Sequence, residues 1–111
     1  MWRKVCTFLI TAFDSRDSEA GTRRASVREQ HLEGAKKLVK ERKLLCAAAI
    51  LDDDSKMIGS VLIVDFPSKD VLLEEWLNKE PYILGNVWKE IDIKPCYVPD
   101  FLLDTSWSLE S

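Results

Sequence analysis

The order of predicted elements, β-α-β-β-α-β, indicates an α+β domain with a four-stranded antiparallel sheet and both helices on one face. Two observations lead to this prediction. Four apolar or β-branched runs suit strands, and two segments with apolar positions at three- and four-residue steps separate the first strand from the second and the third from the fourth. This split β-α-β order is the ferredoxin-like arrangement. Its uncovered sheet face predicts a partner.

The composition fits one globular domain of 111 residues, with 46% hydrophobic and 32% charged residues. A net charge of −3 argues against nucleic acid or an anionic membrane surface as a partner. The longest apolar run, 44–51, is too short to span a bilayer, and the amino terminus lacks a signal-type segment, so we expect a cytoplasmic protein. Cys6, Cys46 and Cys96 match no compact metal site, which predicts reduced, partly buried thiols and neither metal nor cofactor.

The first strand is expected over residues 2–13, and the polar segment 14–24 predicts a loop. Ser26 and Glu29 then form a capping box, in which each side chain accepts a hydrogen bond from the backbone N–H of the other residue. The first helix is therefore expected to begin at Ser26. His31 borders the apolar stripe of this helix and is expected to point inward or to an edge. The stripe comprises Val27, Leu32, Ala35, Leu38 and Val39.

The two central strands are expected to form a hairpin. The run 44–51 predicts a strand buried on both faces, and the segment 52–55 supplies turn residues before a strand over 59–66. Ser68 is expected to cap a second helix that continues to about residue 78.

The last strand is expected over residues 87–97, where apolar and charged residues partly alternate. Pro81 separates it from the second helix. Residues 99–111 are too apolar for a purely solvated tail. We therefore predict a domain over residues 1–98 and a carboxyl-terminal extension over 99–111 that docks on the domain or on a second subunit.

The sole histidine, His31, and the carboxylate of Glu80 are the candidate catalytic pair. Histidine exchanges protons near neutral pH, and a carboxylate beside it would orient the ring and stabilise its imidazolium form. Arg28 precedes His31 by one helical turn, so its guanidinium is a candidate ligand for an anionic substrate oxygen. Ser60 and Tyr82 are candidate hydrogen-bond donors to the same substrate.

Each of these residues also has a plain structural interpretation. His31 would then be a helix-border residue that binds the backbone or a partner chain. Arg28 would be a solvated cation paired with a nearby acid. Glu80 would belong to a surface turn, and Tyr82 would be a packing residue.

Several short motifs resemble the YCII-related (YciI-like) family. These motifs are Ser-Val-Arg-x-x-His-Leu at 26–32, Gly-Ser at 59–60, Glu-Pro-Tyr at 80–82 and Ile-Lys-Pro at 93–95. The resemblance implies a ferredoxin-like fold that pairs through its sheets as a homodimeric α+β barrel, with a pocket near His31. In the family the turn usually reads Asp-Pro-Tyr, and its carboxylate is proposed to form a dyad with the histidine. Here Glu80 takes the place of that aspartate.

The resemblance also implies a function. One branch of the family resembles dehydrochlorinases that act on chlorinated hydroxyhydroquinones, which favours a lyase or isomerase with an unidentified small-molecule substrate. In this hypothesis His31 is the general base and Glu80 holds its tautomer. The alternative is a non-catalytic dimeric module that binds a small ligand or supports assembly. A contact within about 3.2 Å that opens to a cavity favours catalysis, whereas a histidine sealed by apolar contacts favours binding or structure.

Overall fold

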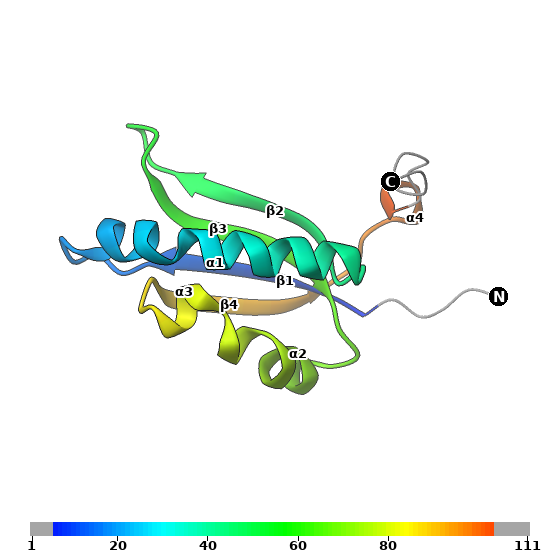
Figure 1. Cartoon of the computed structure of the whole chain (residues 1–111). Helices are drawn as coiled ribbons and strands as arrows, with labels where there is room; N and C mark the ends of the chain where they lie inside the picture. Colours follow the sequence, from blue (N-terminus) through cyan, green and yellow to red (C-terminus); the bar gives the residue numbers. More distant parts are fainter. Residues whose placement is uncertain (1–5, 104–111) are drawn as a thin grey trace.

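The computed structural model describes residues 6–103. The elements are β1 (Thr7–Asp14), α1 (Ala20–Lys40), β2 (Leu44–Leu51), β3 (Met57–Asp65), α2 (Lys69–Glu75), the 3₁₀ turn η1 (Leu77–Lys79), α3 (Pro81–Leu84), β4 (Trp88–Cys96) and α4 (Asp100–Leu103). The strands form one antiparallel sheet in the order β2-β3-β1-β4 (Figure 1). The predicted ferredoxin-like arrangement is confirmed. None of the helices within residues 6–103 is long and apolar enough to cross a membrane.

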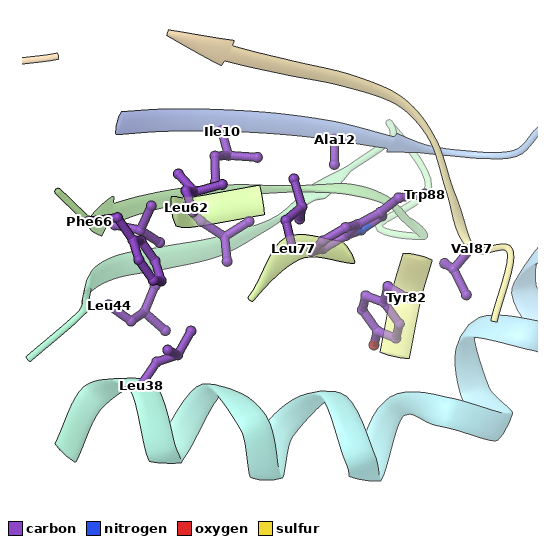
Figure 2. Close-up of a cluster of buried hydrophobic side chains, with 12 residues drawn as sticks. Ile10, Ala12, Leu38, Leu44, Leu62, Phe66, Leu77, Tyr82, Val87 and Trp88 are labelled. Carbon is purple, nitrogen blue, oxygen red and sulfur yellow. The ribbon is translucent and has the colours of Figure 1, made fainter. Parts of the chain in front are cut away.

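One face of the sheet carries the hydrophobic core. Ile10 on β1 pairs with Leu62 on β3, and both side chains are buried. Figure 2 shows the sheet on one side of this cluster and α1 on the other. Burial of each large apolar side chain contributes about 1.5–3 kcal/mol, so this layer is the main source of stability. The helical segments add Leu38, Leu72, Leu77 and Tyr82 to the core.

The opposite face of the sheet is apolar over β1 and β3. Successive strand residues point to opposite faces, so Leu9 and its partner Ile63 lie on the side away from the core. Thr11 and its partner Val61 continue this face, and Phe13 beside them is 39% exposed. Within residues 6–103, the helices that supply core residues pack against the other face.

The strand β2 lies at the edge of the sheet. Its bounds match the prediction, but residues 46–49 are exposed, so the expected burial on both faces is wrong. A short apolar run does not distinguish a central strand from an edge strand that is rich in alanine. Cys46 is exposed, which contradicts its predicted partial burial, whereas Cys6 and Cys96 are partly buried as expected. All three thiols are free.

The helix α1 begins at Ala20, six residues before the predicted start. The carboxylate of Asp17 accepts a hydrogen bond from the backbone N–H of Glu19 at 3.1 Å and binds the Arg23 guanidinium at 2.8 Å through both oxygens. These contacts stabilise a first turn that the capping-box motif does not indicate. Ser26 lies inside the helix and donates its hydroxyl to the carbonyl of Arg23. The expected loop over 14–24 is therefore confined to its first half.

Ser26→Ala is expected to change the free energy of unfolding by less than about 0.5 kcal/mol, because Ser26 is an exposed residue within the helix. Loss of a helix cap would cost about 1 kcal/mol. Urea denaturation of the two proteins separates these values. A loss near the larger figure would restore Ser26 as the helix start.

The predicted second helix is divided into two short segments, α2 and η1, and a third segment, α3, follows it. Ser68 caps α2 as expected, accepting a hydrogen bond from the backbone N–H of Val71 at 3.2 Å. The helix ends at Glu75, before the predicted end at residue 78. Pro81 was expected to separate the second helix from the last strand, and it is instead the first residue of the short helix α3. A proline disfavours helical geometry in the preceding residue, and Glu80 accordingly has extended backbone with φ −66° and ψ 132°.

The remaining boundaries differ little from the sequence prediction. The strand β3 begins two residues earlier than expected, and β4 lacks one residue at each end of the predicted range 87–97. The first strand begins at Thr7, while residues 2–5 of its predicted range lie outside the part that the structure describes. Most of the predicted extension, residues 104–111, lies outside it as well.

Candidate acid–base site

His31 and Glu80 are in direct contact. The Nδ1 atom of His31 on α1 lies 2.8 Å from Oε2 of Glu80, which immediately precedes α3. The side chains are 14% and 2% exposed, respectively. The hypothesis of a spatial pair is therefore supported by the geometry, and His31 lies at the border of the buried layer as expected.

Both oxygens of the Glu80 carboxylate have a partner. Oε1 accepts a hydrogen bond from the backbone N–H of Tyr82 at 2.6 Å, which caps α3, while Oε2 faces His31. A carboxylate only accepts hydrogen bonds, so in a neutral imidazole the proton lies on Nδ1. The lone pair is then on Nε2, which is the nitrogen that can accept a proton.

Two aromatic side chains fix the imidazole ring. Tyr82 stacks on His31 with 3.9 Å between ring centroids and an interplanar angle of 11°. Trp88 meets His31 edge to face at 5.8 Å and meets Tyr82 edge to face at 5.4 Å. Tyr82 and Trp88 are themselves buried among core residues (Figure 2). The ring plane of His31 is thus held by packing as well as by the hydrogen bond to Glu80.

A buried ion pair also lies beside Tyr82. The guanidinium carbon of Arg24 lies 4.8 Å from the Tyr82 ring centroid, and Nη1 contacts both oxygens of Asp14 at 2.8 Å. The Arg24 and Asp14 side chains are 9% and 8% exposed. Nη2 of Arg24 also reaches the hydroxyl of Ser60 at 3.4 Å. This cluster is linked to His31 through the Tyr82 ring.

The predicted substrate-binding residues occupy three different environments. Tyr82 touches His31 directly, whereas Ser60 is buried and accepts from Arg24 instead of facing the dyad. Arg28 is exposed on α1, one turn before His31. The structure therefore brings together His31, Glu80 and Tyr82. Ser60 is connected to this group through Arg24, which contacts both Ser60 and Tyr82.

Sequence reasoning did not assign Arg24, Asp14 or Trp88 to the site. A signal for Arg24 was present, because it precedes His31 by seven residues, which is two helical turns on one face. That signal was hidden by the predicted helix start at Ser26, which left Arg24 in a loop.

Burial raises the pKa of the Tyr82 phenol, and the positive charges of Arg24 and Arg28 partly oppose this effect. In the unfolded chain the phenol loses its proton near pH 10. Tyr82 therefore contributes stability that is fully present below about pH 10 and is lost as the pH rises through its higher folded-state pKa.

The predicted pH dependence can be measured in a Tyr97→Phe background, in which Tyr82 is the sole tyrosine. The phenolate absorbance is expected to appear above the ordinary tyrosine range in folded protein and within that range in urea. Tyr82→Phe is expected to lose less stability between about pH 9 and pH 11 than the protein with Tyr82. An equal loss in both proteins would contradict the assignment.

One cavity of about 380 Å³ adjoins Glu80 and is lined by Leu38, Phe66 and Trp76 together with Lys37 and Lys43. Its lining includes Glu80 but not His31. A second cavity of about 460 Å³ lies beside Asp14, at the end of β1. Within residues 6–103, no three His, Cys, Asp or Glu side chains gather as metal ligands would.

The family model described as the YCII-related domain matches residues 6–97. The chain belongs to the YCII-related family. An uncharacterized protein of Haemophilus influenzae is 32% identical over 79 residues, which cover 66% of this chain and 80% of that protein. Family membership agrees with the motifs at 26–32 and 80–82, although the predicted domain boundary after residue 98 stays a prediction.

Two solved structures are similar to this chain to different degrees. The first is a 5-chloro-2-hydroxyhydroquinone dehydrochlorinase of Burkholderia phenoliruptrix in complex with 2,5-dihydroxybenzoquinone, with a TM-score of 0.70 and 20% identity. The match covers 86% of this chain and 97% of that enzyme. The second is a dimeric ferredoxin-like protein from an uncultured marine organism, with a TM-score of 0.49, 15% identity and coverage of 86% and 96%. The dehydrochlorinase similarity establishes a shared fold.

Proposed function

We propose that this protein is a small-molecule acid–base enzyme in which His31 removes a proton and Glu80 positions the imidazole. The observation that supports this proposal most strongly is the 2.8 Å contact between Nδ1 of His31 and the buried carboxylate of Glu80. A buried carboxylate is unfavourable unless it is paired and hydrogen-bonded, and here one oxygen faces the histidine and the other a backbone N–H. Membership in the YCII-related family and the fold shared with a dehydrochlorinase support the same reaction class.

The proposed reaction starts from a compact ring or enol that carries a hydroxyl and a leaving group. Nε2 of His31 takes the hydroxyl proton, and the O–H electron pair forms a carbonyl as the conjugated double bond shifts. On an aromatic ring the proton first returns to the carbon that bears the leaving group, which makes that carbon tetrahedral. A second hydroxyl then loses its proton, its electron pair shifts through the ring, and the leaving group departs with its bonding pair, which completes an elimination. If the reaction stops once the proton has returned to carbon, it is an isomerisation. Glu80 stabilises the imidazolium in both cases, and general-base action of this kind contributes about 10²–10⁴ in rate.

The other predicted residues have secondary roles in this proposal. Arg28 lies one turn before His31 and is exposed, so its guanidinium can bind a substrate oxygen. Tyr82 holds the imidazole plane by stacking. Ser60 acts indirectly, because its hydroxyl contacts Arg24.

The test uses 5-chloro-2-hydroxyhydroquinone as the probe and chloride release as the readout. His31→Gln keeps polarity and approximate size, and it is expected to lower the catalysed rate by about 10²–10⁴. Retention of the folded state is checked by the backbone amide spectrum. Gln30→Ala, an exposed neighbour on α1, is the matched control and is expected to keep the wild-type rate.

Two results would count against the proposal. Equal chloride release by wild-type protein and His31→Gln would remove His31 from the chemistry. Release by neither protein, together with no exchange of the ring C–H of 2,5-dihydroxybenzoquinone in deuterated water, would exclude both elimination and proton transfer for this substrate class.

A non-catalytic ligand-binding module is the second candidate. The observation that favours it is the enclosure of His31, which is 14% exposed and packed against Tyr82 and Trp88. In addition, the cavity beside Glu80 does not include His31 in its lining. Calorimetric binding of 2,5-dihydroxybenzoquinone without chloride release or C–H exchange would favour this alternative.

We also propose that two copies of the chain pair through the open sheet face to form an α+β barrel. The apolar face defined by Leu9, Val61 and Ile63 supports this pairing, since such a face gains stability when it is covered. Sedimentation of the wild-type protein is expected to give the mass of two 12.7 kDa chains. Val61→Glu is expected to give one chain, whereas Val39→Glu on the exposed side of α1 leaves the dimer intact. A wild-type monomer would contradict the pairing.

A further inference from the structure

Two buried N–H groups near the dyad have no hydrogen-bond acceptor within residues 6–103. They are Nε of Arg24 and Nε1 of Trp88, and the two residues are 7% and 5% exposed. A buried donor left without an acceptor costs about 1–3 kcal/mol, so such groups in native proteins require an explanation. A ligand atom that accepts a hydrogen bond from each donor would explain both groups, and it would place the ligand beside the proposed base.

The two donors lie around one aromatic ring. The Arg24 guanidinium carbon is 4.8 Å from the Tyr82 centroid, and the Trp88 indole meets the same ring edge to face at 5.4 Å. The Trp88 indole also lies 5.8 Å from the His31 ring. Both donors therefore belong to the side chains that surround Tyr82 and the proposed base.

The position of the Arg24 donor is fixed by its other contacts. Nη1 binds both oxygens of Asp14 at 2.8 Å, and Nη2 reaches Ser60 at 3.4 Å. Because the guanidinium group is planar and rigid, these contacts also set the direction of the Nε–H bond. The Asp14 charge balances that of Arg24, so the residue offers a directed donor to a ligand at little cost in reorganisation.

We propose that Arg24 and Trp88 form an oxygen-binding subsite that holds an enolate or phenolate oxygen of a planar ring ligand. This inference rests on the proposed function of His31 and names the substrate group that the site recognises. Two N–H donors match the lone pairs of one oxygen, and a negative charge on that oxygen strengthens both hydrogen bonds. Because both donors are covered, neighbouring side chains must move when the oxygen enters.

The experiment measures binding of 2,5-dihydroxybenzoquinone by calorimetry in a Cys46→Ser background, which removes the exposed thiol as a competing nucleophile. Trp88→Phe deletes the N–H but keeps an aromatic ring, and it is expected to raise Kd about tenfold, as loss of one hydrogen bond to a charged group would. Trp76→Phe is the matched control. It makes the same change of indole to phenyl, but at a ring that stacks on Phe66 with 6.0 Å between the centroids. Its Kd is expected to equal that of the parent.

A second variant and a second ligand complete the test. Arg24→Lys keeps a cation opposite Asp14 but deletes the Nε–H, and it is expected to weaken binding by a similar factor. The dimethoxy analogue of the probe lacks ionisable hydroxyls and is expected to bind more weakly to the parent and equally to both variants.

Equal affinity of the parent and Trp88→Phe would overturn the subsite, as would failure of the parent to bind the probe. Unchanged chloride release in His31→Gln would instead overturn the proposed function, since that assay keeps both Arg24 and Trp88. The two failures are therefore distinguishable.

Discussion

Glu80→Ala is expected to lower the free energy of unfolding by about 2–4 kcal/mol. The carboxylate is 2% exposed, caps α3 through the backbone N–H of Tyr82 and faces Nδ1 of His31. Its removal leaves both of these donors without their acceptor in a buried environment. Loss of a cap alone costs about 1 kcal/mol, and each buried donor that is left unsatisfied costs about 1–3 kcal/mol. Urea denaturation followed by tryptophan fluorescence measures the change.

The controls separate the loss of the whole carboxylate group from the loss of its negative charge. Glu75→Ala, at an exposed position that ends α2, is expected to change stability by less than about 0.5 kcal/mol. Glu80→Gln retains one oxygen to cap α3, so it is expected to lose less stability than Glu80→Ala. A loss below about 0.5 kcal/mol in Glu80→Ala would show that this carboxylate supports neither α3 nor the imidazole.

Glu80→Gln also separates the role of Glu80 in folding stability from its role in the proposed reaction. The amide has one acceptor and one donor end, so capping Tyr82 with its oxygen turns the NH₂ group toward Nδ1 of His31. That arrangement places the imidazole proton on Nε2 and removes the lone pair that the proposed reaction uses. A variant that folds well but no longer releases chloride is therefore the expected outcome.

The parts of the fold that were predictable from the sequence depend on local signals. The hairpin between β2 and β3 follows from the turn residues 52–55, where the Asp52 carboxylate accepts from the backbone N–H groups of Asp54 and Lys56 at 2.9 Å. Ser68 likewise caps α2 with its own side chain. In each case the partner lies within four residues, so the pattern in the sequence contains the whole interaction.

The errors arise where an interaction outside the recognised motif overrides that motif. Ser26 and Glu29 match a capping box, yet the helix begins at Ala20 because the adjacent Asp17 engages Arg23 and the backbone of Glu19. The two-face burial predicted for β2 fails for a similar reason, since edge position depends on strand order rather than on composition.

The candidate site was predictable only in part. His31 and Glu80 are separated by 49 residues, and the family resemblance rather than their spacing suggested that they meet. The Arg24 cluster joins β1, α1 and β3 through Asp14, Arg24 and Ser60. No periodic pattern links these three positions, so the cluster required the fold before it could be recognised.

Arg24→Met is expected to destabilise the protein by about 3–5 kcal/mol, because it leaves the Asp14 carboxylate buried without its partner. The side chains of Arg24 and Asp14 are 9% and 8% exposed, and both carboxylate oxygens lie 2.8 Å from Nη1. Removing both charges avoids the isolated buried carboxylate. The double variant Asp14→Asn with Arg24→Met is therefore expected to be more stable than Arg24→Met alone, which a double-mutant cycle in urea measures.

Arg23→Met is the matched control for this cycle, since Arg23 is the adjacent residue on α1 and also binds an aspartate at 2.8 Å. Its side chain is 31% exposed and that of Asp17 is 44% exposed, so water screens the pair and solvates whichever charge remains. We therefore expect a much smaller loss for Arg23→Met than for Arg24→Met. Similar losses in the two variants would mean that burial does not distinguish the pairs, and the Arg24 guanidinium would then lack the rigid setting that the oxygen-binding subsite requires.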